Sequence, residues 1–219
     1  MKNNLQTILF DLDGTLLDTH LDMCAALNVI LNNHGKPEIP AVNLRPFVSK
    51  GSMVMVCLAF KCLPGSEQSK QLWQEMIDAY AENIANHTNL FPGMDAVLEK
   101  IQNNGQRWGI VTNKPGHLTR ILLKELSLPF KPHVVVSGDT LKVKKPDPGP
   151  LLYACQQIDA NPETAMYIGD DERDIQAGKS AGMQTLAASY GYITDEENPE
   201  EWNANGIISE AEDILNWIN

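Results

Sequence analysis

Two aspartates stand two residues apart where a short apolar run ends near the start of the chain. The run covers residues 7–10, and Asp11 and Asp13 follow it. Residues i and i+2 of an extended segment point to the same side, so both carboxylates can face one ligand. Two negative charges at this range are costly unless a cation or a shared proton relieves them. The pair alone is typical of an Asp-Gly turn, but its position after a strand favours a site.

A second group of acids follows another apolar run, at residues 165–168. Asp170 and Asp171 come next, and Asp174 lies one helical turn further on. Carboxylates that share a cation with waters and a phosphate suit Mg²⁺. Spacing alone leaves open which of Asp170 and Asp171 would meet the metal, and it favours a positioning role for Asp174. The alternative is that these acids only stabilise the first turn of a helix.

Two further segments contain polar or cationic residues that could bind phosphate. Thr112 and Asn113 follow an apolar run that ends at residue 111, and Lys145 directly precedes a proline. A hydroxyl, an amide and backbone N–H groups at a helix start can hold phosphate oxygens, and an ammonium pairs with phosphate. A helix cap and a solvated lysine are the alternatives.

Together these residue types predict phosphoryl transfer. Asp11 would attack phosphorus and form an aspartyl phosphate. Asp13 would protonate the leaving oxygen and then take a proton from water. Mg²⁺ and Lys145 would neutralise the charge on the phosphoryl oxygens.

The elements that must position these residues alternate between strands and helices after residue 91. We expect strands at 7–10, 107–111, 133–136, 165–168, 185–188 and 206–208, and helices at 94–103, 118–126, 148–158, 173–181 and 210–218. This order predicts an α/β fold, a Rossmann-like parallel sheet with helices on both faces. Ligands of such sheets bind beyond the carboxyl ends of the strands.

Residues 18–86 show helical periodicity and no alternating strand pattern. We therefore expect an α/β catalytic core of residues 1–17 and 87–219 with an inserted α-helical cap of residues 18–86. A cap over the site would exclude water and contact the substrate beyond its phosphate. Our hypothesis is that Lys50, with Arg45, reaches the substrate; a solvated helix start is the alternative. Helical spacing places Trp73, Met76, Ile77 and Tyr80 in the core rather than on a ligand.

Four motifs in order resemble the haloacid dehalogenase superfamily. They are Asp-Leu-Asp-Gly-Thr at 11–15, Thr-Asn-Lys at 112–114, Lys-Pro at 145–146 and Gly-Asp-Asp-Glu-Arg-Asp at 169–174. The whole chain is similar to the phosphatase branch, to phosphoglycolate phosphatase-like proteins. The stretch at 189–193 also resembles N-acetylmuramic acid 6-phosphate phosphatases.

The resemblance implies a role for each matching residue. Asp11 would be the nucleophile and Asp13 the acid and base, and Mg²⁺ would be held by Asp11, the Asp13 carbonyl and Asp170. The phosphate and substrate would be bound by Asp11, Gly14, Thr112, Asn113 and Lys145. Asp174 and Asp171 would support these groups from behind, although position 171 often carries a small hydroxyl residue in relatives.

The predicted function is a Mg²⁺-dependent phosphatase for a small phosphomonoester, with phosphoglycolate as the first expectation. N-acetylmuramic acid 6-phosphate or another sugar phosphate is the alternative. A phosphotransferase similar to β-phosphoglucomutase is a further one. From another class, a response-regulator receiver also places an Asp, a Thr and a Lys at strand ends.

Composition limits the partners. The 219 residues include 17 Lys and Arg against 28 Asp and Glu, a net charge of −11, which argues against nucleic acid or an anionic membrane. The longest apolar run, residues 53–60, is short against the roughly 20 residues of a membrane helix. The four cysteines show no metal or disulfide spacing, so reduced thiols are expected. We expect a cytoplasmic monomer or homodimer acting on a phosphorylated metabolite.

Overall fold

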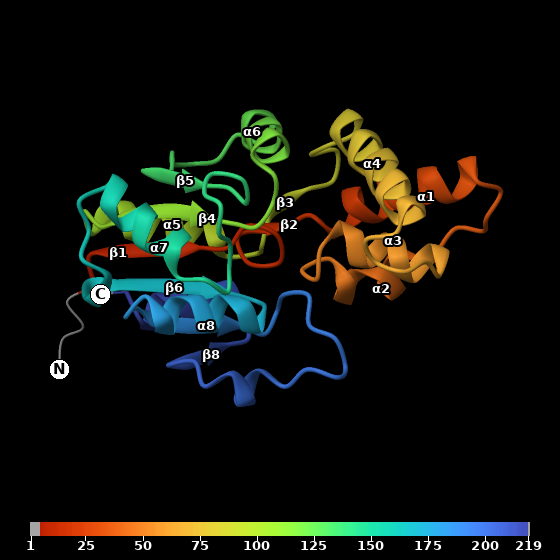
Figure 1. Cartoon of the computed structure of the whole chain (residues 1–219). Coiled ribbons are helices and arrows are strands. Elements are labelled where there is room, and N and C mark those ends of the chain that lie inside the picture. The colour runs from red at the N-terminus through yellow and green to blue at the C-terminus, as the bar shows by residue number, and fades with distance from the viewer. Residues whose placement is uncertain (1–4, 219) are drawn as a thin grey trace.

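A six-stranded parallel sheet forms the centre of the protein. The computed structural model describes residues 5–218, and the strand order is β5-β4-β1-β6-β7-β8 (Figure 1). Each neighbouring pair is parallel. The strands are β1 (Thr7–Phe10), β4 (Arg107–Val111), β5 (Val134–Val136), β6 (Ala165–Gly169), β7 (Gln184–Ala188) and β8 (Gly206–Ile208). The predicted fold class is confirmed, including the short edge strand at 206–208.

Strand β1 lies between β4 and β6 and is buried along its whole length. Ile8 and Phe10 belong to one apolar cluster, and Leu9 between them belongs to another. Successive side chains of a strand point to opposite faces, so each face of the sheet has its own core.

Four helices cover the two faces. Residues of α5 (Met94–Asn103) and α6 (Gly116–Glu125) share the cluster of Phe10, whereas α7 (Gly149–Gln157) and α8 (Glu172–Ser180) share the cluster of Leu9. Helices therefore lie on both faces, as expected for strands joined by right-handed crossovers.

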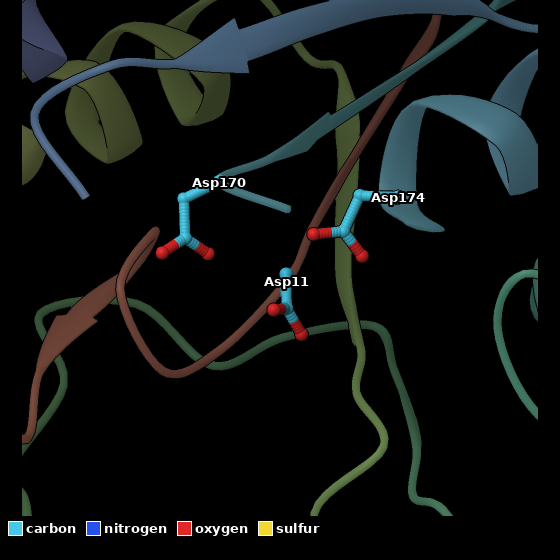
Figure 2. A group of neighbouring side chains, drawn as sticks. All are labelled: Asp11, Asp170 and Asp174. Atoms are coloured by element: carbon cyan, nitrogen blue, oxygen red, sulfur yellow. The ribbon is translucent and has the colours of Figure 1, made fainter. Parts of the chain in front are cut away.

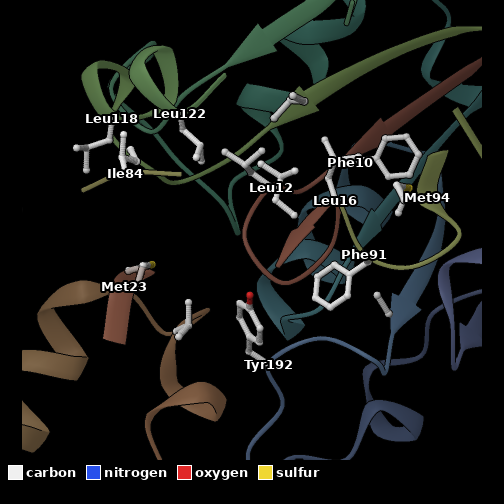
Figure 3. Packing of buried hydrophobic residues seen from close by; sticks show 14 of the residues in the cluster. Phe10, Leu12, Leu16, Met23, Ile84, Phe91, Met94, Leu118, Leu122 and Tyr192 are labelled. Carbon is white, nitrogen blue, oxygen red and sulfur yellow. The ribbon is translucent and has the colours of Figure 1, made fainter. Parts of the chain in front are cut away.

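A group of helices lies beside the sheet (Figure 1), and in sequence it is inserted between two short strands that pair with each other in antiparallel fashion. The strands are β2 (Leu17–Asp18) and β3 (Asn89–Leu90), and the helices are α1 (His20–Asn33), α2 (Ala41–Leu44), α3 (Ser52–Phe60) and α4 (Glu67–Glu82). Figure 3 shows that apolar packing continues between the two parts, from Met23 of α1 to Leu118 of α6 and Tyr192. The helical group is thus packed against the core.

The last helix of the structure differs in type from the predicted one. Instead of an α-helix over 210–218, residues Ala211–Asn216 form a 3-10 helix. Asp213 accepts hydrogen bonds from the N–H groups of Ser209 and Glu210, and these contacts start a tight turn. Ile214 and Ile218 are both buried, so tertiary packing sets this short segment. Among residues 5–218, no helix is both long and apolar enough to cross a bilayer.

Candidate active site

The carboxyl ends of three adjacent strands bring the predicted polar residues together. Asp11 follows β1, Thr112 follows β4 and Asp170 follows β6, and β1 lies between the other two. Parallel strands end at the same edge of a sheet, so residues far apart in sequence meet there.

Three buried carboxylates form the centre of the site. Oxygens of Asp11, Asp170 and Asp174 all lie within 4.8 Å of one another. Figure 2 shows them gathered beside the segment that follows β1. Burial raises the pKa of Asp11 to about 7, although Lys145 opposes the shift. Burial and the neighbouring charges of Asp11 and Asp174 raise the pKa of Asp170 well above its ordinary value. Negative charge here is costly without a cation.

Lys145 supplies a cation on one side of these acids. Its Nζ lies 2.7 Å from Asp11 Oδ1 and 2.6 Å from Asp174 Oδ1, and it donates to the Tyr167 hydroxyl at 2.7 Å. The other oxygen of Asp174 accepts the Asp171 N–H at 3.1 Å. Both oxygens of Asp174 therefore have partners within the protein, a lysine and a backbone N–H.

Asp170 is held by three donors. Its oxygens accept hydrogen bonds from the Thr15 hydroxyl at 3.2 Å, the Ser49 hydroxyl at 2.7 Å and the Tyr192 N–H at 2.8 Å. Gly14 approaches it closely: a Cβ at this position would lie 2.1 Å from Asp170 Oδ2, and the φ of +87° also favours glycine. The Asp-Gly turn therefore leaves room for the second acid.

These residues fit a hard divalent cation. The donors are carboxylate oxygens, the acids are buried with raised pKa values, and Asp11 Oδ1 has a close ion pair to Lys145 without a well-angled hydrogen bond. An oxygen-only donor set with spare lone pairs suits Mg²⁺ better than a soft metal.

The Asp13 side chain lies outside the acid triad. Its carboxylate forms an ion pair with Lys114, whose Nζ lies 2.9 Å from Oδ1 and donates to the Tyr80 hydroxyl at 3.1 Å. Burial raises the pKa of Tyr80 to about 12. Sequence reasoning assigned Lys114 no role, although it stands in the Thr-Asn-Lys motif, because the partner of a lysine is decided by tertiary contacts.

Asp171 is also outside the triad. Its side chain accepts the Arg173 N–H at the start of α8 and forms ion pairs with Arg173 and Lys50. Burial alone would raise the pKa of Asp171, but the two cations lower it to about 2. The carboxylate that faces Asp11 is therefore that of Asp170.

The two predicted phosphate binders on the β4 unit have partners within the protein. The Thr112 hydroxyl accepts the Lys114 N–H at 3.1 Å. The side chain of Asn113 donates to the Lys145 carbonyl at 3.0 Å and accepts the Lys145 N–H at 3.1 Å. Asn113 thus fixes the backbone of the segment that carries Lys145.

Two basic residues of the helical group bind the core in different ways. Lys50 lines the cavity and pairs with Asp171 at 2.8 Å and with Glu197. Arg45 instead donates to the carbonyls of Tyr190 and Gly191, each at 3.0 Å. The hypothesis that Arg45 joins Lys50 at the substrate is wrong in this structure, because the guanidinium is already bound to these carbonyls.

A cavity of about 460 Å³ lies between the sheet edge and the helical group. Its polar end contains Asp11, Asp13, Thr112, Asn113 and Lys145. Trp73, Met76, Ile77 and Tyr80 border it as well, although they also belong to the apolar core or pack against it, as their helical spacing predicts. Helical spacing shows which residues share a face but not that the face borders a cavity.

Fold and site together define an α/β enzyme whose buried carboxylate site lies beneath a helical group. The model of the haloacid dehalogenase-like hydrolases matches residues 8–188. The chain belongs to this hydrolase family, so the receiver alternative is wrong.

Individual relatives match over nearly the whole chain. A phosphoglycolate phosphatase of Xanthomonas campestris is 40% identical over 94% of this chain and 92% of its own length. An N-acetylmuramic acid 6-phosphate phosphatase of Pseudomonas aeruginosa is 38% identical over 100% and 96%. The crystal structure of a predicted phosphoglycolate phosphatase from Haemophilus somnus has a TM-score of 0.85 at 26% identity, covering 99% of both chains.

Proposed function

We propose that this protein is a Mg²⁺-dependent phosphatase that hydrolyses a small phosphomonoester through a phosphorylated Asp11. The observation that carries this proposal is the position of Asp11 at the polar end of the cavity, close to both Lys145 and Asp170. Relatives with phosphatase names that match over nearly the whole chain support it.

Asp11 is the nucleophile in this proposal. A carboxylate oxygen forms a bond to phosphorus while the bond from phosphorus to the ester oxygen breaks, and water then attacks the aspartyl phosphate to release inorganic phosphate. Lys145, 2.7 Å from Asp11 Oδ1, is placed to offset charge on the phosphoryl oxygens.

Asp13 is the general acid and base. It donates a proton to the departing ester oxygen and later accepts one from the attacking water. Lys114 fixes the orientation of this carboxylate, because its Nζ lies 2.9 Å from Asp13 Oδ1. In this proposal the Asp13 side chain carries the transferred proton and does not bind Mg²⁺.

Gly14, Thr112 and Lys145 bind the phosphate in this proposal, and Asn113 contributes by holding the backbone of Lys145. Asp11, Asp170 and the Asp13 carbonyl would hold Mg²⁺, and Asp171 and Asp174 keep the surrounding groups in place. A bound Mg²⁺ supplies positive charge that favours the approach of phosphate to a carboxylate.

Relatives suggest two substrates, 2-phosphoglycolate and N-acetylmuramic acid 6-phosphate. A phosphotransferase related to β-phosphoglucomutase would return the phosphoryl group to a sugar, so release of free phosphate separates the two reactions. Monomeric or dimeric state and cytoplasmic location stay predictions.

The test is phosphate release from p-nitrophenyl phosphate in Mg²⁺. We expect EDTA to stop the reaction and Asp11→Asn to lower kcat by about 10⁴-fold or more, as for other covalent nucleophiles. The matched control is Asp95→Asn on the exposed side of α5, which should keep full activity. Unchanged turnover in a folded Asp11→Asn protein would refute the proposal.

A further inference from the structure

A serine of the helical group reaches the acid site. Ser49 lies in the short segment before α3, and its Oγ is 2.7 Å from Asp170 Oδ2 and 3.2 Å from the Asp13 carbonyl oxygen. Asp170 and that carbonyl are two of the three groups proposed to hold Mg²⁺. A hydroxyl has one proton to donate, and a charged oxygen is the stronger acceptor, so the bond to Asp170 is favoured. The helical group thus contacts the proposed cation site directly.

This contact decides which oxygen of Asp170 keeps a free lone pair. Among residues 5–218, Oδ2 accepts both the Ser49 hydroxyl and the Tyr192 N–H, whereas Oδ1 accepts only the Thr15 hydroxyl. Each carboxylate oxygen can accept about two hydrogen bonds. Oδ2 is therefore fully used by the protein, and Oδ1 keeps a lone pair that a cation can take.

The position of Ser49 is fixed by contacts on both sides of its side chain. Arg173 Nη2 donates to the Ser49 carbonyl at 2.6 Å, and the neighbouring Lys50 pairs with Asp171 at 2.8 Å. Asp171 and Arg173 belong to the turn that begins at Asp170. The segment before α3 is therefore bound to the same turn that carries the proposed metal ligand.

The donors to Asp170 come from both parts of the protein. Thr15 and Tyr192 belong to the core, and Ser49 belongs to the helical group. Separation of the two parts would remove the Ser49 bond, and the carboxylate would then be held less firmly. Removal of a group that orients a metal ligand typically weakens metal binding by about 10- to 100-fold.

We infer that Ser49 is a positioning residue for Mg²⁺: its hydroxyl orients Asp170 for the cation and thereby links cation binding to docking of the helical group. This inference rests on the proposed phosphatase function, from which it takes the metal site. Linkage is reciprocal, so a cation that binds the docked form more tightly also favours that form by the same factor. Mg²⁺ therefore stabilises the docked helical group before a substrate enters the cavity.

The first test is the Mg²⁺ affinity of the full-length protein without substrate, measured by isothermal titration calorimetry. Ser49→Ala should raise the Kd of Mg²⁺ by about 10- to 100-fold. The matched control is Ser52→Ala in the first turn of α3, because the Ser52 hydroxyl accepts the Trp73 indole N–H and has no hydrogen bond to the acids within residues 5–218. It should leave the Kd unchanged. An unchanged Kd in a folded Ser49→Ala protein, or an equal rise in both variants, overturns the inference.

The second test follows the helical group itself by hydrogen–deuterium exchange. The N–H groups of Val54 and Met55 bond to the Gly51 carbonyl in the first turn of α3. We expect Mg²⁺ to slow exchange in this turn of the wild-type protein and to have little effect in Ser49→Ala, with α5 of the core as the reference for global stabilisation. Equal slowing in the two proteins overturns the link, because a serine with a purely structural role would not change the response to Mg²⁺.

Failure of the inference and failure of the proposed function give different results. If the wild type binds Mg²⁺ and hydrolyses p-nitrophenyl phosphate while Ser49→Ala binds Mg²⁺ equally well, only the inference is overturned. If Ser49→Ala weakens Mg²⁺ binding but the wild type hydrolyses no ester, the phosphatase is refuted and the positioning role of Ser49 is supported. A wild-type protein that binds no Mg²⁺ refutes both.

Discussion

At the scale of single residues, the site is a balance of buried charge. Asp11 and Asp170 have raised pKa values because burial removes their hydration, while Lys145 compensates only part of the negative charge. The metal-free protein therefore binds protons at pH values where an exposed aspartate has lost them. A divalent cation would replace these protons.

This balance predicts a pH-dependent effect of Mg²⁺ on stability. A carboxylate with a raised pKa favours the metal-free fold at low pH, and that contribution is lost as the pH rises through about 7 for Asp11. Mg²⁺ must displace the proton below that pH, so the increase in Tm caused by Mg²⁺ should be larger at about pH 8 than at about pH 5.5. Thermal unfolding at both pH values checks this.

The control for that experiment is NaCl at matched ionic strength, which should raise Tm equally at the two pH values. An equal Mg²⁺ effect at the lower and the higher pH would contradict the assignment of the cation to these acids.

At the scale of elements, the start of α1 depends on a residue distant in sequence. Thr19 at the N-cap makes no side-chain cap. The Tyr192 hydroxyl instead accepts the N–H groups of Thr19 at 2.7 Å and His20 at 3.0 Å, and donates to Asp18 at 2.7 Å. The Tyr192 N–H also binds Asp170. One residue thus connects the acid triad to the first helix of the helical group.

Tyr192→Phe should lower the free energy of unfolding by about 1–3 kcal/mol, because it leaves buried N–H groups without an acceptor. Urea denaturation measures the change. Tyr153→Phe on α7 removes a hydroxyl for which no hydrogen bond is found among residues 5–218 and should change stability little. A Tyr192→Phe protein as stable as the wild type would show that water replaces the hydroxyl.

At the scale of the whole molecule, polar contacts as well as apolar packing join the helical group to the core. Lys50 pairs with Asp171 and Glu197, Arg173 donates to the Ser49 carbonyl at 2.6 Å, and Ser49 donates to Asp170. The segment before α3 therefore touches the acid triad and borders the cavity. Substrate binding and the position of the helical group should be coupled there.

Lys50→Ala should lower kcat/KM by about 10-fold for the preferred ester, because it removes a cation from the cavity and releases Asp171 and Glu197. Steady-state kinetics measure this, with Lys100→Ala, exposed on α5, as the control. A folded Lys50→Ala enzyme with unchanged kcat/KM would remove Lys50 from substrate binding.

Local patterns along the chain were enough to establish the class of fold and the composition of the site. Alternating strands and helices required a parallel sheet, and polar residues at strand ends had to meet at one edge. Asp11, Thr112 and the pair Asp170 and Asp171 could therefore be expected at one edge from the amino-acid sequence alone, whereas spacing did not separate Asp170 from Asp171. These features depend on residue periodicity and on the handedness of crossovers, both of which are encoded locally.

The partner that each charge meets was settled by tertiary contacts. Lys114 binds Asp13, Asp171 binds Arg173 and Lys50, and Asp174 binds Lys145. Tertiary packing also places Met76 in the buried core and at the border of the cavity at once. Long side chains reach several neighbours with similar ease, and packing between distant segments selects among them, which residue spacing along the chain does not encode.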